Sequence, residues 1–126
     1  MRYLLDTTLI ADHAHGFAPA VALLGRLYAD GAELFTCDVV TCEALSGGTD
    51  DHLDAVARLL EPLEYVATSP AAAHWAAASR LKRHRAGGRL GLGDSLIAGV
   101  AAELGAAVVT RNRPDFERQG IEVLSY

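Results

Sequence analysis

Short apolar runs recur along the chain and are separated by longer amphipathic or alanine-rich stretches. Each run has the length of a buried strand, and several are followed at once by a polar residue that can begin a helix. The pattern predicts strands over residues 2–5, 33–37, 65–67, 106–109 and 121–124. The sheet should therefore contain four to five strands.

Apolar residues at helical spacing fill the intervals between these runs. Capping residues, turn signals and glycine stops bound most of these segments. The pattern predicts helices from about residue 9, over 18–29, from an N-cap at Asp38 through 45, over 51–63, over 71–85 and over 93–104, with a brief one from 116. Strands that alternate with helices indicate an α/β fold with a largely parallel sheet.

Length and composition fit one folded unit. The 126 residues are 51% hydrophobic and only 6% aromatic, so we expect a single domain over residues 1–126 with a core of Leu, Val, Ile and Ala. The first apolar run ends at Asp6 and is too short for a signal peptide or a membrane span. We therefore expect a cytoplasmic protein without membrane contact, in which Cys37 and Cys42 are buried, reduced thiols.

Charge is distributed unevenly along the chain, whose formal net charge is −5. Residues 1–79 contain 3 basic and 11 acidic side chains, whereas residues 80–126 contain 8 basic and 5 acidic ones. An acidic pocket beside a basic strip can bind phosphates next to a metal ion, although a solvated helix face would carry the same charges. We predict an RNA-binding strip formed by Arg80, Lys82, Arg83, Arg85, Arg89 and Arg111.

Four acidic residues fall where predicted strands end or the next helices begin. Asp6 follows the first strand, Asp94 opens a helix, Asp115 lies past the fourth strand, and Glu43 lies in the helix after the second. Ligands collect at the carboxyl ends of parallel strands, so these carboxylates can converge there. Taken singly, Asp6, Asp94 and Asp115 have an ordinary alternative interpretation as helix N-caps.

The setting of Glu43 and the type of donor point to metal chemistry. Glu43 stands in a short, largely apolar helix, and we expect a semi-buried carboxylate, which is costly unless it is paired or metal-bound. Carboxylate oxygens without His or Cys companions suit Mg²⁺ or Mn²⁺ better than zinc. Such ions activate water and stabilise charge in phosphoryl chemistry. The pattern predicts a metal site for phosphoryl chemistry at Asp6, Glu43, Asp94 and Asp115.

Four segments, in order, resemble the acidic motifs of the PIN-domain family and, within it, of the VapC-type toxins of toxin–antitoxin pairs. Leu4-Leu5-Asp6-Thr7-Thr8-Leu9-Ile10 is similar to the first motif and Thr41-Cys42-Glu43-Ala44-Leu45 to the second. Leu92-Gly93-Asp94-Ser95-Leu96-Ile97-Ala98 is similar to the third, and Val109-Thr110-Arg111-Asn112-Arg113-Pro114-Asp115-Phe116 to the fourth, which is the most specific. The resemblance covers essentially the whole chain.

This resemblance implies a PIN-like three-layer α/β/α sandwich and a metal-dependent endoribonuclease that cleaves RNA. It implies Mg²⁺ or Mn²⁺ held by the four acids, Thr8 and Thr110 as supporting hydroxyls, and Asn112 as an auxiliary polar residue near the metal. It also implies inhibition by a cognate antitoxin protein and assembly as a homodimer.

Two alternatives remain open. A phosphatase of the haloacid dehalogenase type also begins with an Asp after its first strand, but it has a second acid two residues later, where this chain has Thr8. A non-catalytic RNA- or protein-binding PIN-like module would keep the fold without the activity. Hydrolysis of a small phosphate ester without RNA cleavage would favour the phosphatase, and absence of metal-dependent RNA cleavage would favour the binding module.

Overall fold

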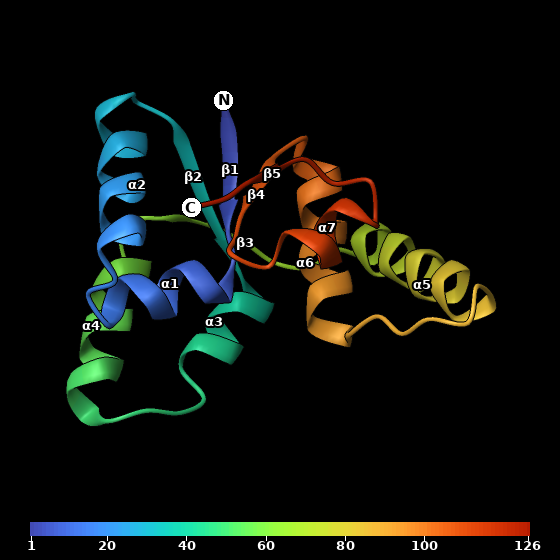
Figure 1. The fold of residues 1–126 in the computed structure, drawn as a ribbon, viewed down its shortest axis with the longest axis horizontal. Coiled ribbons are helices and arrows are strands. Elements are labelled where there is room, and N and C mark those ends of the chain that lie inside the picture. Colours follow the sequence, from blue (N-terminus) through green and yellow to red (C-terminus); the bar gives the residue numbers. More distant parts are fainter.

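A five-stranded sheet forms the centre of the computed structural model, which describes residues 1–126 (Figure 1). Its strands are β1 (Arg2–Leu5), β2 (Glu33–Cys37), β3 (Glu64–Val66), β4 (Ala107–Val109) and β5 (Val123–Leu124). They lie in the order β3-β2-β1-β4-β5, and every neighbouring pair is parallel. The predicted mostly parallel sheet is confirmed, and all carboxyl ends of the strands lie at one edge.

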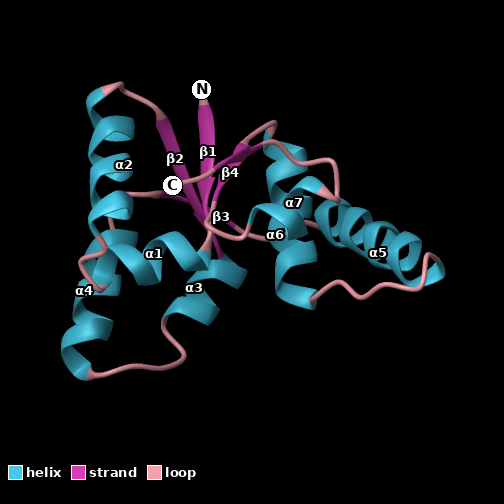
Figure 2. Cartoon of the chain, in the orientation of Figure 1, coloured by secondary structure: helices cyan, strands magenta, loops and turns pink.

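Helices cover both faces of this sheet (Figure 2). They are α1 (Thr7–Ala14), α2 (Ala18–Ala29), α3 (Asp38–Ala44), α4 (Asp50–Leu60), α5 (Pro70–Arg85), α6 (Leu92–Leu104) and α7 (Arg113–Glu117). Figure 1 shows α1, α2 and α4 on one side and α5, α6 and α7 on the other, with α3 near the carboxyl ends of the strands. This is the predicted three-layer α/β/α sandwich. None of the helices combines the length and apolar character that crossing a membrane requires.

Small residues allow α5 and α6 to pack closely. A Cβ added to Gly99 on α6 would lie 2.4 Å from the carbonyl oxygen of Ala72 on α5, so no larger residue fits there without moving the backbone. Aliphatic side chains of the central strands, including Leu4 and Val108, are fully buried beneath the helices. The aliphatic and alanine-rich core expected from the composition is confirmed, and it holds β1 and β4 side by side.

Two local predictions fail at the junction of β2 and α3. Cys37, not Asp38, occupies the N-cap position of α3. Asp38 instead accepts hydrogen bonds from the backbone N–H and hydroxyl of Thr68, which tie the end of β2 to the loop before α5. Cys37 is buried as expected, but Cys42 is exposed, so the prediction of a second buried thiol was wrong. Val40 and Ala44 of α3 are buried, whereas Cys42 lies on the solvent side of this helix.

Candidate active site

Asp6 lies at the point where the central strand β1 passes into α1. The residue is buried, with a relative exposure of only 2%. The Thr110 hydroxyl donates a hydrogen bond to Asp6 Oδ2 at 2.7 Å, and the Thr8 hydroxyl donates to the same oxygen at 3.1 Å. Neither hydroxyl engages Oδ1, so the two threonines orient the carboxylate while one of its oxygens keeps its capacity to bind a cation.

The loop after β4 holds these two threonines in place. The backbone N–H of Arg111 donates to Thr8 Oγ1 at 3.2 Å, and that of Asn112 donates to Thr110 Oγ1 at 2.9 Å. The N–H of Asp6 donates to the carbonyl of Val109 at 3.0 Å, which continues the β1–β4 pairing. Each hydroxyl therefore accepts from the loop and donates to Asp6, and this fixes its direction.

Burial raises the pKa of Asp6, and the hydrogen bond from Thr110 opposes part of that rise. No ion pair compensates the carboxylate. The ion pairs of the structure join Arg2 with Glu33, Arg111 with Asp12, and Arg113 with Glu117, so none involves a predicted site acid. The four predicted site acids therefore form no ion pair within the protein.

Asp94 interacts electrostatically with each of the other three acids. It lies in the first turn of α6, half-buried, and its pKa is raised to about 7. Burial is the largest cause, and the negative charges of Asp6, Asp115 and Glu43 add to it. The structure thus brings together all four acids that the sequence predicted, from four different segments, at the carboxyl edge of the sheet.

The N-cap interpretation of these acids does not account for their positions. Asp6 occupies the N-cap position of α1, but its side chain makes no capping hydrogen bond. Asp94 is inside α6, whose N-cap is Gly91, and Asp115 is inside α7, whose N-cap is Asn112. None of the three caps its helix with its side chain.

Glu43 differs from its predicted setting because it is exposed, so the expectation of a semi-buried carboxylate was wrong. Val40 and Ala44 of α3 face the protein, whereas the Glu43 side chain extends along the surface toward α6. The Thr7 hydroxyl donates to Glu43 Oε1 at 2.7 Å. A Cβ added to Gly93 would lie 2.6 Å from Glu43 Oε2, so the glycine before Asp94 leaves the space that Glu43 occupies.

Asp115 is held by two amide side chains. The Asn112 side-chain amide donates to Asp115 Oδ2 at 2.8 Å, and the Gln119 amide donates to the Asp115 carbonyl, also at 2.8 Å. Asn112 therefore lies beside Asp115, and its role near a metal ion stays a prediction. Gln119 was not predicted from the sequence, although its position four residues after Asp115 is the spacing of neighbours on a helix.

The donor set fits a hard divalent cation in its chemistry. Four carboxylates share one edge of the sheet, no protein cation neutralises them, and oxygen is the donor that Mg²⁺ and Mn²⁺ prefer. As the structure stands, no three His, Cys, Asp or Glu side chains are close enough to hold an ion together. Side-chain rotation, available to the exposed Glu43, is needed to close the set.

The predicted RNA-binding residues separate into three groups. Lys82, Arg83 and Arg89 line a cavity between α5 and α7. Arg80 donates from Nε to the carbonyl of Leu90 and does not line that cavity, and neither does Arg85.

Arg111 forms the third group, because its guanidinium forms an ion pair with Asp12. Its Nε lies 3.4 Å from Asp12 Oδ2, the oxygen that also accepts the Tyr126 hydroxyl at 2.7 Å. The RNA contact of Arg111 stays a prediction, and its ion pair with Asp12 also suits holding the loop that orients Thr8.

Replacement of Thr110 by Val tests the hydroxyl support of Asp6. The valine fits the same buried space but leaves Asp6 without its shortest hydrogen bond, so we expect a loss of about 1–3 kcal/mol in the free energy of unfolding at neutral pH. The loss should shrink in acid, because protonated Asp6 no longer needs stabilisation of its charge. Urea unfolding at neutral and at acidic pH measures both values.

Thr110→Ser is the matched control, since it retains the hydroxyl and should lose much less stability. If Thr110→Val lost the same free energy of unfolding at both pH values, Thr110 would not stabilise the charge of Asp6. The loss would then come from the Asn112 N–H, which no longer has the Thr110 hydroxyl as its acceptor.

Comparisons with known proteins agree with this arrangement. The family model for the PIN domain matches residues 3–121. Ribonuclease VapC19 of Mycobacterium tuberculosis is 29% identical over 111 residues, which are 86% of this chain and 87% of that protein. The match to the PIN-domain model extends over all four acidic segments, which leaves no support for the haloacid dehalogenase alternative.

Solved structures share the fold. VapBC2 from Rickettsia felis, bound to a DNA fragment from its promoter, has a TM-score of 0.86 at 21% identity, and covers 100% of this chain and 99% of that one. A toxin–antitoxin complex from Klebsiella pneumoniae has a TM-score of 0.72 at 23% identity, and covers 90% and 89%. Since the family model spans most of the chain and the fold matches throughout, this protein belongs to the PIN domain family.

Proposed function

We propose that this protein is a metal-dependent endoribonuclease that acts as the toxin of a toxin–antitoxin pair. The observation that carries the proposal is the gathering of Asp6, Glu43, Asp94 and Asp115 at one edge of the sheet without a cationic partner. Membership of the PIN domain family and the likeness to a named ribonuclease support RNA as the substrate.

The four acids would hold Mg²⁺ or Mn²⁺, which when bound supplies an activated water and stabilises the charge that develops on the phosphate. The protein's own part is to position the acids. Thr8 and Thr110 orient Asp6, and Asn112 orients Asp115. Asp94, with a pKa of about 7, exchanges its proton near neutral pH and so couples cation binding to pH.

The partner proposed for this toxin is a cognate antitoxin protein. The likeness in fold to a toxin–antitoxin complex supports it, together with the membership of the PIN domain family. Assembly as a homodimer and a cytoplasmic location remain predictions from the sequence, and neither is needed for the chemistry proposed for the four acids.

Incubation of the purified protein with total RNA tests the activity. We expect cleavage with Mn²⁺ or Mg²⁺. With a chelator in excess of the metal, cleavage should be about a hundredfold slower or more, because the carboxylates alone supply no activated water. Glu43→Gln, which keeps the length of the side chain but removes its charge, controls for a contaminating nuclease. RNA binding without cleavage under all metal conditions would favour the non-catalytic module instead.

A further inference from the structure

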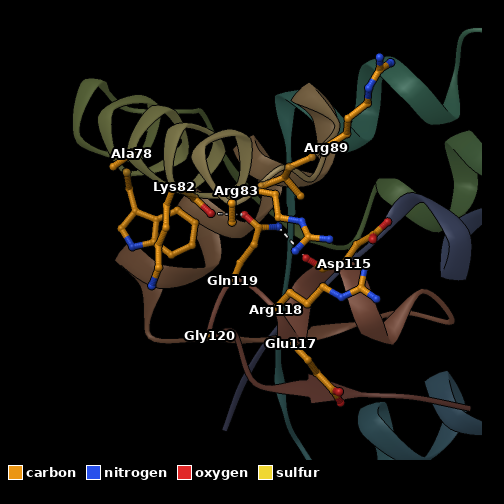
Figure 3. Close-up of a pocket in the computed structure, with 13 residues that line it drawn as sticks. Ala78, Lys82, Arg83, Arg89, Asp115, Glu117, Arg118, Gln119 and Gly120 are labelled. Carbon is orange, nitrogen blue, oxygen red and sulfur yellow. Dashed lines mark hydrogen bonds between the residues drawn. The ribbon is translucent and has the colours of Figure 1, made fainter.

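A cavity of about 580 Å³ lies between α5 and α7, beside the cluster of acids (Figure 3). Its volume is within the range of about 300–1,000 Å³ that small-ligand sites have. Asp115 lines it, so the cavity adjoins the four-acid site directly. A ligand that extends from the cut site can therefore enter it without leaving the protein surface.

Uncompensated positive charge is the first property of this cavity. Lys82, Arg83, Arg89 and Arg118 line it, and none of them forms an ion pair within the protein. The two acids of its wall are Asp115 and Glu117, and Glu117 is paired with Arg113. Figure 3 shows the Arg83 and Arg118 side chains close to Asp115, whereas Arg89 points away. Two unpaired guanidinium groups in the lining of one cavity suit a phosphate.

Arg83 is held in position by the loop that follows α5. A Cβ added to Gly88 would lie 2.3 Å from Arg83 Nε and 2.5 Å from its Cζ, so the guanidinium packs directly against the glycine. The N–H of Gly88 donates to the Arg83 carbonyl at 3.0 Å. Gly88 therefore leaves the space that the Arg83 guanidinium occupies. Because this packing restricts the Arg83 side chain before a ligand binds, less conformational entropy is lost on binding.

The second property is an aromatic and amide wall. Trp75 lines the cavity eight residues before Arg83, which corresponds to about 12 Å along the axis of α5. The Ser79 hydroxyl donates to the Gln119 amide oxygen at 2.9 Å, and both residues line the cavity. An aromatic ring in the same cavity as a phosphate-binding pair suits the base of a nearby nucleotide.

We propose that this cavity binds the unpaired RNA segment next to the cut site, with a phosphate at Arg83 and Arg118 and a base stacked on Trp75. The inference rests on the proposed function and adds to it a subsite, in this cavity, for the nucleotide next to the cut site. A base within a duplex has its faces covered by its neighbours, so only an unpaired base can stack on Trp75. The aromatic wall distinguishes this ligand from an acidic peptide.

Binding to an inactive variant, Asp94→Asn, tests the proposal without cleavage. The probes are a short fluorescent single-stranded RNA of mixed sequence and its duplex of equal length. Trp75 is the only tryptophan of the chain, so its fluorescence reports this cavity. We expect the single strand to quench that fluorescence and to bind at least about fivefold more tightly than the duplex, which should not quench it.

Arg83→Met and Gly88→Ala, made in the same variant, test the contact itself. Arg83→Met should weaken single-strand binding about tenfold and reduce the salt slope by about 0.7 for the lost phosphate contact. Gly88→Ala should weaken binding severalfold by displacing Arg83, and should have no further effect when Arg83 is already Met. Arg26→Met, on α2, is the matched control and should change binding less than about twofold.

Three results would overturn the proposal. One is unchanged binding in both Arg83→Met and Gly88→Ala, and another is an unquenched Trp75 at saturating RNA. The third is an equal loss of affinity in Arg85→Met, which removes a charge from α5 outside the cavity and would indicate only diffuse attraction. Metal-dependent cleavage of total RNA by the parent protein is measured in parallel, so a failure of the cavity and a failure of the proposed function are distinguished.

Discussion

Replacement of Asp94 by Asn is expected to reduce RNA cleavage at least about a hundredfold. Loss of a group that merely supports a metal ligand already costs about 10–100-fold, and Asp94 is proposed as a ligand itself. Asn keeps the shape of the side chain but removes one of the four negative charges proposed to bind the cation. Initial rates on the same RNA at saturating Mn²⁺ measure the loss.

The same substitution should make the metal-free protein more stable at neutral and alkaline pH. The pKa of Asp94 is about 7 in the folded protein and near 3.8 when unfolded, so the folded state binds its proton more tightly. Stability from that proton is complete below about pH 4 and is lost as the pH rises to 7. The asparagine side chain of the variant cannot lose a proton, so the gain over the parent should grow through this window to about 1 kcal/mol, a value reduced for solvent screening.

Chemical unfolding across this pH range, with a chelator present, gives the difference between variant and parent. Asp6→Asn is the companion variant and should be equally inactive. A helix-capping role predicts the reverse result, a small loss of stability with normal activity. Full cleavage activity in both Asp6→Asn and Asp94→Asn would therefore refute the four-acid mechanism, whatever their stabilities.

Millimolar Mn²⁺ is expected to raise the melting temperature of the parent protein, because a cation that binds only the folded state stabilises it by mass action. Below pH 7 a proton on Asp94 competes with the cation. The association constant should therefore rise by up to about tenfold per pH unit toward pH 7 and level off above it. Calorimetric titration at several pH values measures this dependence.

Asp94→Asn serves as the control for this second experiment, since its residual cation affinity should be low and nearly independent of pH in this window. Equal shifts in melting temperature for the parent and for Asp94→Asn would place the bound cation elsewhere on the protein. Absence of any shift, combined with cleavage that a chelator does not affect, would exclude the metal mechanism.

The fold was predictable from sequence because its elements are marked locally. Apolar strands end at polar residues, and Gly105 and Pro70 stand where helices end and begin, so even the short strand β3 was predicted within one or two residues. The four acids were predictable for the same reason, since parallel strands place their carboxyl ends at one edge. Their roles as ligands remain predictions.

Features that depend on the direction of a side chain were not predictable in this way. Glu43 and Cys42 lie in a short helix that also contains apolar residues, but α3 turns both of their side chains toward solvent. The cavity near Asp115 joins Trp75 with Arg118, which are far apart in sequence. The helical spacing of Trp75, Ser79 and Lys82 was visible as one face of α5, but nothing in the sequence indicated which surface that face would meet.

The hydrogen bond between Thr110 and Asp6 has a consequence for biosynthesis, because it joins residues 104 positions apart. Asp6 leaves the ribosome well before its orienting hydroxyl, which arrives only with the strand that precedes Thr110. Until β4 has added to β1, Asp6 lacks both its shortest hydrogen bond and the loop that directs Thr8. A nascent chain therefore carries Asp6, Glu43 and Asp94 before the site can form, because the site needs β4 and the loop that follows it.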